Sequence, residues 1–144
     1  MDKRVMGIDF GSVRVGVAVS DPLKIIAQSV GVYPNNFSLI DELSNIARQF
    51  DVGLVVVGMP YTLKGEKGGK AVEVESFIER LKKQLSVEVV TLDERFTSRI
   101  AQQTLIQMGT TKKQRRTDKG RIDAMASALI LQSFLDQTKH SIGC

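Results

Sequence analysis

The sequence has almost none of the side chains that form the commonest zinc, disulfide and histidine-based sites. It contains one cysteine, Cys144, and one histidine, His140, both close to the C-terminal end. A single cysteine excludes an internal disulfide and a cysteine-based metal site. A single histidine in the terminal segment argues against a histidine-based proton relay. The chemistry of this chain is therefore expected from its carboxylates.

Long hydrophobic runs and clustered aromatic residues are also missing. The longest apolar runs fall far short of the roughly 20 residues that span a bilayer. The first residues lack the apolar stretch and the small-residue cleavage site of a signal peptide, so we expect a cytoplasmic protein that does not enter a membrane. Tyr33, Phe37, Tyr61 and Phe96 lie too far apart in the sequence to predict a stacking platform for single-stranded nucleic acid.

The composition is that of one ordinary globular domain. The 144 residues are 42% hydrophobic and 25% charged, values typical of a globular protein with a single core. The sequence shows no internal repeat, no low-complexity tract and no interdomain linker. We therefore expect a single domain over residues 1–138, followed by a disordered tail at 139–144, in a protein that is a monomer or a homodimer.

Hydrophobic periodicity predicts strands first and helices later. Residues 13–20 alternate in polarity as a half-buried strand does, and the run Leu54–Val57 is typical of a strand covered on both faces. The predicted elements are strands at Val5–Phe10, Val13–Ser20 and Ile25–Tyr33, a helix at Leu39–Phe50, a strand at Leu54–Val57, a helix at Val72–Leu85, a strand at Val87–Leu92, and helices at Thr97–Met108 and Arg121–Asp136.

This order of elements predicts an α/β fold. Three strands joined by short links favour an antiparallel meander, and strands that alternate with helices favour parallel neighbours. We expect a mixed five-stranded sheet, with its first three strands antiparallel and with helices on both faces. The Gly11–Ser12 link predicts a tight hairpin, and Asp21–Pro22 is a turn signal.

Four acidic residues stand where predicted strands end or where the last helix begins. Asp9 closes the first strand, Asp93 and Glu94 close the fifth, and Asp123 opens the last helix. Carboxylates that converge at strand ends suit a hard divalent cation such as Mg²⁺ or Mn²⁺. Because Asp93 and Glu94 are adjacent, they point to opposite faces of a strand, and only one of them can readily join Asp9. The residues leave open which one does.

Positive charge is concentrated beside these acids. Between Arg95 and Arg121 the chain has eight basic residues and one acid, a net charge of +7 in a chain whose total is +4. Such a segment is an electrostatic footprint for phosphate backbones. The residues that we expect to contact nucleic acid are Arg95, Lys112, Lys113, Arg115, Arg116, Lys119 and Arg121.

Each of these residues also has a purely structural interpretation. Asp9 can cap the tight turn at Gly11–Ser12, and Asp123 is favoured by the helix dipole in the first turn of a helix. A basic run can be a solvated loop. Lys64, Lys67 and Lys70, in the glycine-rich loop, are individually better interpreted in that way. It is much easier for one of these acids to have only a structural role than for all of them to have one.

The motifs together resemble the YqgF-type family of pre-16S rRNA nucleases, also called Holliday junction resolvase-like proteins, in the ribonuclease H-like superfamily. The resemblance runs in order from about residue 4 to 136. The matching segments are Gly7-Ile8-Asp9-Phe10-Gly11, residues 16–21, Gly58-Met59-Pro60, Asp93-Glu94-Arg95-Phe96-Thr97-Ser98, and Ile122-Asp123-Ala124-Met125-Ala126 leading to residues 131–135.

The resemblance implies a ribonuclease H-like fold and a metal-dependent nuclease that trims the 5′ end of precursor 16S rRNA. It implies that Asp9, Asp123 and Glu94, or Asp93 in its place, are the catalytic carboxylates and hold one or two Mg²⁺ or Mn²⁺ ions. The basic segment would hold the phosphate backbone, largely without reading sequence.

Three other functions remain open. Related bacterial junction resolvases carry two aspartates one helical turn apart on the last helix, whereas this chain has Ala126 three residues after Asp123. This departure weakens the interpretation as a Holliday junction-resolving DNA endonuclease. A non-catalytic nucleic-acid-binding factor in ribosome assembly or transcription needs only the basic segment. A phosphate-cradling nucleotide-binding lobe is disfavoured, because 144 residues leave no second lobe to close on a nucleotide.

Overall fold

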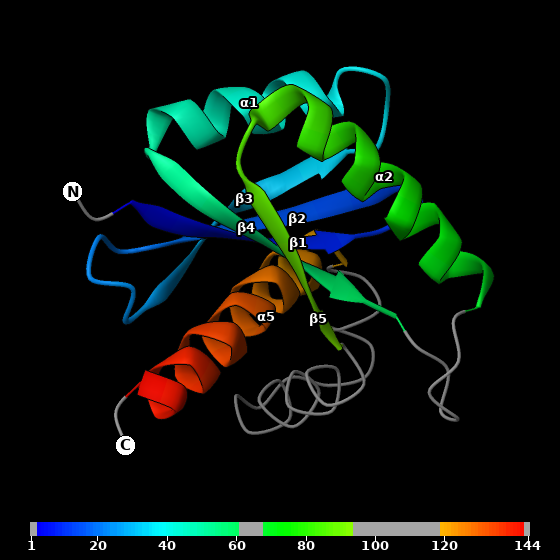
Figure 1. Ribbon diagram of the computed structural model, residues 1–144. Helices are drawn as coiled ribbons and strands as arrows, with labels where there is room; N and C mark the ends of the chain where they lie inside the picture. Colours follow the sequence, from blue (N-terminus) through cyan, green and yellow to red (C-terminus); the bar gives the residue numbers. More distant parts are fainter. Residues whose placement is uncertain (1–2, 61–67, 94–118, 143–144) are drawn as a thin grey trace.

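The described part of the protein is built on one five-stranded sheet (Figure 1). The structure is a computed structural model that describes residues 3–60, 68–93 and 119–142. Its strands are β1 (Arg4–Phe10), β2 (Arg14–Ser20), β3 (Ala27–Pro34), β4 (Val52–Met59) and β5 (Glu88–Asp93). The spatial order is β3-β2-β1-β4-β5. Strand β2 is antiparallel to both β1 and β3, whereas β4 is parallel to β1 and β5 is parallel to β4, which confirms the predicted mixed sheet.

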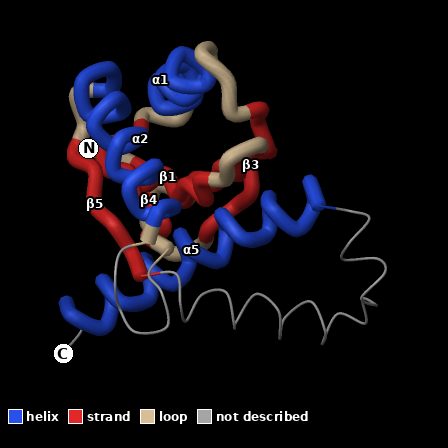
Figure 2. Tube along the Cα trace, turned by 90° about the vertical axis from the view of Figure 1, so that its right-hand side faces the viewer, coloured by secondary structure: helices blue, strands red, loops and turns tan. Residues whose placement is uncertain are grey.

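Helices cover both faces of this sheet, as predicted. Helices α1 (Leu39–Gln49) and α2 (Gly69–Leu85) pack on one face, and α5 (Lys119–Ile142) crosses the other (Figures 1 and 2). The predicted helix at Thr97–Met108 lies outside the described residues. Among the helices in the described ranges, none is both long enough and apolar enough to cross a membrane.

Two helices are longer than their sequence patterns predicted. Helix α2 begins at Gly69 rather than at Val72, and α5 runs to Ile142 rather than ending at Asp136. Apart from Ala71 and Ile142, the extra residues are polar or glycine and carry no apolar periodicity. A helix that has formed extends cheaply, however, because each added residue gains a backbone hydrogen bond. The Thr138 hydroxyl also donates to the Phe134 carbonyl, at 2.9 Å, within the extension of α5.

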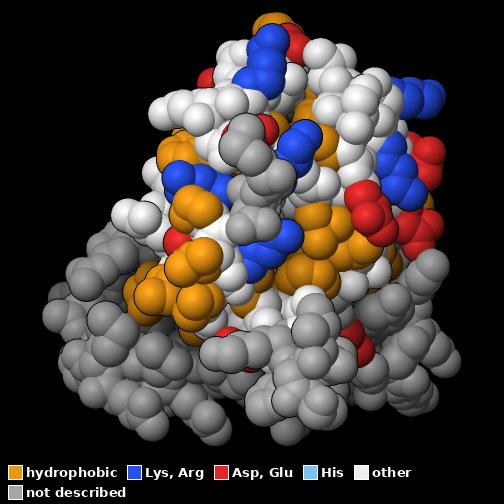
Figure 3. Space-filling view, turned by 60° about the vertical axis from the view of Figure 1, so that its left-hand side comes forward, with side chains coloured by type: hydrophobic (Ala, Val, Ile, Leu, Met, Phe, Trp, Pro, Cys, Tyr) orange, Lys and Arg blue, Asp and Glu red, His pale blue; other side chains and the backbone are white. Residues whose placement is uncertain are grey.

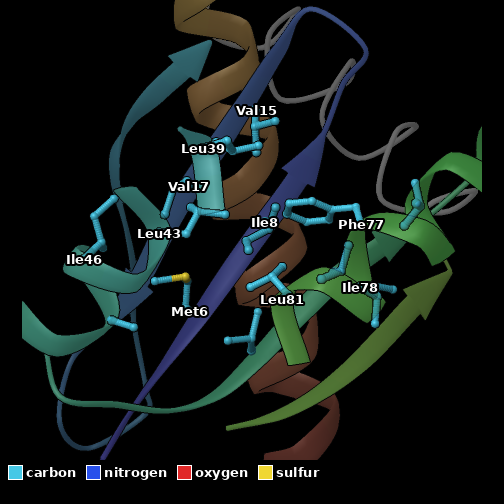
Figure 4. Packing of buried hydrophobic residues seen from close by; sticks show 14 of the residues in the cluster. Met6, Ile8, Val15, Val17, Leu39, Leu43, Ile46, Phe77, Ile78 and Leu81 are labelled. Carbon is cyan, nitrogen blue, oxygen red and sulfur yellow. The ribbon is translucent and has the colours of Figure 1, made fainter. Parts of the chain in front are cut away.

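The alternation of side chains along β1 divides the core into two clusters. Met6 and Ile8 point toward α1 and α2, where they are fully buried. Figure 4 shows this cluster, in which side chains from the sheet interdigitate with those of both helices. Its labelled members are Met6, Ile8, Val15, Val17, Leu39, Leu43, Ile46, Phe77, Ile78 and Leu81.

The second cluster lies under α5. It joins Val5 of β1 to side chains of β2, β4, β5 and α5, and its buried members are Val5, Ala18, Val56, Leu92, Ile130, Leu131 and Leu135. Because residues two apart on a strand share a face, Gly7 and Asp9 lie on the same face of β1 as Val5. The face that α5 covers is therefore the face that carries Asp9.

Helix α5 packs against the backbone of β1 at Gly7. A Cβ atom at Gly7 would lie 2.6 Å from the Leu131 Cβ and 3.2 Å from the Ser127 carbonyl oxygen. Both distances are shorter than the roughly 3.5–4.0 Å of an ordinary contact. Only glycine allows this approach. The depth at which α5 sits on the sheet is therefore set by the absence of a side chain at this position.

The turn between β2 and β3 is held by side chains at both of its ends. The Asp21 Oδ1 accepts hydrogen bonds from the Ile25 and Ile26 N–H groups at 2.7 and 2.9 Å. These bonds hold the pKa of Asp21 below its ordinary value. The Gln132 side chain of α5 accepts from the Ala27 N–H and donates to the Ile25 carbonyl, each at 2.9 Å. Asp21 is therefore a turn residue, as its sequence context predicted.

Candidate active site at the carboxyl edge of the sheet

Asp9 is the reference point of the candidate site. It is half-buried and lies one residue before the end of β1, on the face covered by α5. Its partner on β2 is Gly16. On β4, Ile8 pairs with Val57, so the same register brings Gly58 beside Asp9. Neither of these directly neighbouring positions has a side chain.

Strand β5 places Asp93 on the face of the sheet opposite to Asp9. Leu92 pairs with Gly58 and belongs to the cluster under α5. Asp93 pairs with Met59 and shares its face with Val89, which packs against the α1 and α2 cluster. Asp9 and Asp93 therefore lie on opposite faces of the sheet. Glu94 lies outside the described residues.

Helix α5 leads back toward Asp9. Its residues Ser127 and Leu131 contact Gly7, and Gln132 reaches the turn between β2 and β3, near the beginning of β1. The helix therefore runs antiparallel to β1, and its N-terminal turns lie toward the end of β1 that carries Asp9 (Figure 1). Asp123 is four residues before Ser127, which is one helical turn, so the two positions share a helix face.

The arrangement brings together some of the predicted site residues and does not test others. The backbones of β1 and α5 place Asp9 and the position of Asp123 toward the same end of the sheet. Within residues 3–60, 68–93 and 119–142, no three His, Cys, Asp or Glu side chains form a group that could hold a metal ion. The predicted trio needs Glu94, which is not among those residues.

A surface pocket adjoins Asp9. It is lined by the chain from Asp9 to Arg14, which forms the β1–β2 hairpin, together with Pro60 and Lys70, and its volume is about 290 Å³. The hairpin is so tight that a Cβ atom at Gly11 would clash with the Arg14 carbonyl oxygen. The Ser12 hydroxyl donates to Glu73 of α2 at 3.3 Å and so joins the hairpin to that helix.

The predicted nucleic-acid-binding residues fall mainly outside the described ranges. This holds for Arg95, Lys112, Lys113, Arg115 and Arg116. Lys119 and Arg121 belong to the first turn of α5. On the side of the molecule shown in Figure 3, Lys and Arg side chains are interspersed with acidic and hydrophobic ones.

Two basic residues near Asp9 were missed by the sequence analysis. Arg14 was assigned only to a strand, and Lys70 to a solvated loop, whereas both line the pocket beside Asp9. A signal for Arg14 was present in the sequence. In a hairpin as short as Gly11–Ser12 predicts, Arg14 stands nearly opposite Gly11, on the face of Asp9.

Comparison with known proteins gives one family and a consistent set of relatives. The family model described as "RuvX: Holliday junction resolvase" matches residues 3–137. A protein of Salinibacter ruber named "Putative pre-16S rRNA nuclease" is 44% identical over 138 residues, which cover 95% of each chain. A protein of Sulfurihydrogenibium sp. with the same name is 36% identical over 140 residues, covering 96% of this chain and 93% of the relative.

Solved structures share the fold at low sequence identity. The Thermus thermophilus RuvC in complex with a Holliday junction substrate has a TM-score of 0.58 and 16% identity, with 94% of this chain and 96% of that chain covered. The fowlpox virus resolvase in complex with Holliday junction DNA has a TM-score of 0.56 and 12% identity, covering 94% and 98%. These matches support the ribonuclease H-like fold that the sequence predicted.

Proposed function

The chain belongs to the RuvX family, and on this basis we propose that it is a nuclease that hydrolyses phosphodiester bonds and processes the 5′ end of precursor 16S rRNA. The names of its relatives support this choice of substrate. The observation that carries the proposal is the position of Asp9 at the carboxyl edge of the sheet, between two glycines and under the helix that carries Asp123. Such processing would take place in the cytoplasm.

The extent of the family match also supports the proposal of one nuclease domain over residues 1–138. The matched range is 3–137. Within it, the described strands form a single sheet, and helices on both faces pack on that sheet.

We assign the catalytic carboxylates to Asp9, Glu94 and Asp123. Leu92 points toward α5, so continued alternation would bring Glu94 to the face of Asp9, whereas Asp93 lies on the other face. Asp123 is one turn before Ser127, the first of the two residues of α5 that touch Gly7. The choice that the sequence left open between Asp93 and Glu94 is thus made in favour of Glu94.

This donor set fits Mg²⁺ or Mn²⁺. All three residues offer carboxylate oxygens, the ligands that these hard cations take, and the positions beside Asp9 on β2 and β4 are both glycines. Asp9, Glu94 and Asp123 would hold the ions. Bound divalent cations supply Lewis-acid stabilisation of the charge that develops on the phosphate during displacement. The protein's own part is to fix the carboxylates on a rigid strand and helix.

The basic segment would hold the substrate strand next to these acids. Arg95 follows Glu94 directly, and Lys119 and Arg121 belong to the helical turn that leads to Asp123. Cations in these positions neutralise backbone phosphates and give binding that weakens as salt is raised. Contacts of this kind position a strand without reading its sequence.

The proposed function is tested by cleavage of a labelled RNA that covers the 5′ segment of precursor 16S rRNA, with and without Mn²⁺. We expect Asp9→Asn to lower the rate by more than about 100-fold, because even groups that only support a metal ligand contribute 10–100-fold. Asp51→Asn is the matched control. Asp51 is exposed between α1 and β4 and has a φ of 53°, a conformation that asparagine tolerates well. Full metal-dependent cleavage by Asp9→Asn would refute the catalytic assignment.

Resolution of Holliday junctions is a second candidate, favoured by the description of the family model. The single aspartate at this point of α5, with Ala126 three residues later, counts against it. A four-way DNA junction in the same assay separates the two. Cleavage of the junction in preference to both matched duplex and RNA would assign the enzyme to junctions.

A non-catalytic binding factor gives a third pattern of results. In that case the wild-type protein binds the RNA in a salt-sensitive manner but yields no product. Binding then survives Asp9→Asn and falls when Lys112, Arg115 and Arg116 are replaced by glutamine, because those cations alone hold the backbone.

A further inference from the structure

The pocket beside Asp9 has the features of a phosphate-binding site. It is formed by the β1–β2 hairpin and the beginning of α2, and it contains the cationic side chains Arg14 and Lys70. Its volume of about 290 Å³ is at the lower end of the range for small-molecule sites. A pocket of this size suits a single phosphate with its sugar better than a complete, enclosed ligand.

Arg14 lies on the same face of the sheet as Asp9. Asp9 pairs with Gly16, and Arg14 is two residues before Gly16 on β2. Residues two apart on a strand share a face, and a diagonal neighbour on the next strand lies within reach of a long side chain. Gly16, between them in the register, leaves this approach unobstructed by a side chain of its own. An arginine here can contact a phosphate held close to Asp9.

Lys70 approaches the pocket from the other side, on the first turn of α2. Gly68, the residue before the helix, is its N-cap and makes no side-chain capping hydrogen bond. The first turn of α2 contains no acidic residue, and a Cβ atom placed at Gly69 would meet nothing within 4 Å. A helix N-terminus of this kind favours an anion, and the ammonium of Lys70 adds to the effect.

Two carboxylates must be set against these cations. Glu73 accepts a hydrogen bond from Ser12 and so is engaged at the rim of the pocket. Asp9 lines the pocket itself, and its negative charge would oppose the binding of a phosphate. The divalent cation proposed for Asp9 removes this repulsion, so we expect the pocket to bind phosphate most strongly when the metal site is filled.

We propose that Arg14 and Lys70 bind one backbone phosphate of the substrate strand, next to the phosphate that is cleaved. The proposal rests on the nuclease function proposed above. It adds a subsite on the α2 side of Asp9, formed by residues outside the basic segment 95–121. By fixing a phosphate beside the scissile one, the subsite would set which linkage reaches the carboxylates.

The test combines substitutions in the protein with single uncharged linkages in the RNA. The probe is the labelled RNA of the precursor 16S rRNA 5′ segment, made as a series in which one phosphate at a time is replaced by a methylphosphonate. Binding is measured in the Asp9→Asn background, which removes both turnover and the charge of the carboxylate. The variants are Lys70→Gln and Arg14→Gln. Lys83→Gln, an exposed lysine in the last turn of α2, is the matched control.

We expect one methylphosphonate position to weaken binding by about tenfold in the parent protein, as loss of a charge-assisted hydrogen bond does. The same linkage should have little further effect in Lys70→Gln or Arg14→Gln, but its full effect in Lys83→Gln. Lys70→Gln should also reduce the salt dependence of binding by about one counterion. If the loss of affinity caused by the methylphosphonate and the loss caused by Lys70→Gln or Arg14→Gln add in full at every linkage, the proposed subsite is wrong.

Folding and function are controlled separately. Thermal unfolding shows whether each variant is folded, and Lys70 is exposed on a helix, so its variant remains informative if Arg14→Gln is unstable. If the wild type cleaves the RNA but no methylphosphonate position is coupled to Lys70→Gln in binding, only the subsite is overturned. Absence of cleavage by the wild type overturns the proposed function, and coupling measured by binding would still locate the phosphate.

Discussion

The contact between α5 and Gly7 allows a quantitative prediction for Gly7→Ala. The added Cβ atom would lie 2.6 Å from the Leu131 Cβ and 3.3 Å from the Leu131 Cα. An ordinary carbon–carbon contact is about 3.5–4.0 Å, so the overlap at the nearer atom is about 1 Å. Both atoms belong to or adjoin the backbone of α5 and cannot rotate away. The helix must therefore move outward, at the cost of about 1–3 kcal/mol that is typical of an overpacked core.

The movement of α5 should also affect the candidate site. Asp123 is on the same helix, two turns before Leu131, and would move with it. Catalytic groups tolerate displacements of about 0.5 Å, and a misplacement of about 1 Å can lower a rate by about 100-fold. We therefore expect Gly7→Ala to lose both stability and activity, including at temperatures at which the variant is fully folded.

The stability change is measured by urea unfolding, with Gly31→Ala as the matched control. Gly31 is also a strand glycine of the same sheet, but its added Cβ would meet only Tyr33, at 3.5 Å or more, which is an ordinary contact. We expect Gly31→Ala to change the free energy of unfolding by less than about 0.5 kcal/mol. If Gly7→Ala is as stable and as active as Gly31→Ala, the proposed control of α5 by Gly7 is wrong.

Two further predictions concern the far end of the sheet. The buried Ser20 Oγ accepts a hydrogen bond from the Val5 N–H at 2.9 Å. Ser20→Ala should therefore lower the free energy of unfolding by about 1–3 kcal/mol. The control Ser29→Ala, at an exposed position of β3, should change this free energy little. Turn N–H groups lower the pKa of Asp21, so its ionised form stabilises the fold above its ordinary pKa of about 3.9, and this stabilisation is lost as the pH falls through the lower folded-state pKa. Asp21→Asn should therefore reduce the thermal midpoint at pH 7, and the difference from wild type should shrink in acid. A difference that is constant with pH would contradict this.

The sheet could be predicted from the sequence because its central strands are continuous apolar runs, the pattern of strands that are covered on both faces. Met6 and Ile8 alternate with Val5 and Gly7, and the β-branched run of β4 reports burial on both sides. The ends of the helices could not be predicted in the same way. Gly69 and Lys70 have no apolar periodicity, and their helical conformation depends on the rest of α2.

The sequence could propose residue types for the candidate site but not its geometry. A carboxylate at the end of an apolar strand marked Asp9. Which of Asp93 and Glu94 shares its face depends on the register of β5 against β4, and register is set by pairing across strands that the sequence does not state. Arg14 and Lys70 were missed as a pair for a related reason. They are 56 positions apart in the chain and meet only because α2 packs across the end of β1.

The central claim is that the catalytic carboxylates lie on the face of the sheet covered by α5. The measurement that tests it most directly is the rate of Mn²⁺-dependent cleavage of the labelled precursor RNA by Glu94→Gln and by Asp93→Asn. Asp93 is the last residue of β5, on the face opposite to Asp9, and Glu94 is the acid that we propose for the face of Asp9. We predict that Glu94→Gln loses cleavage, as Asp9→Asn does, and that Asp93→Asn retains most of it. Loss of cleavage in Asp93→Asn with a fully active Glu94→Gln would contradict this claim.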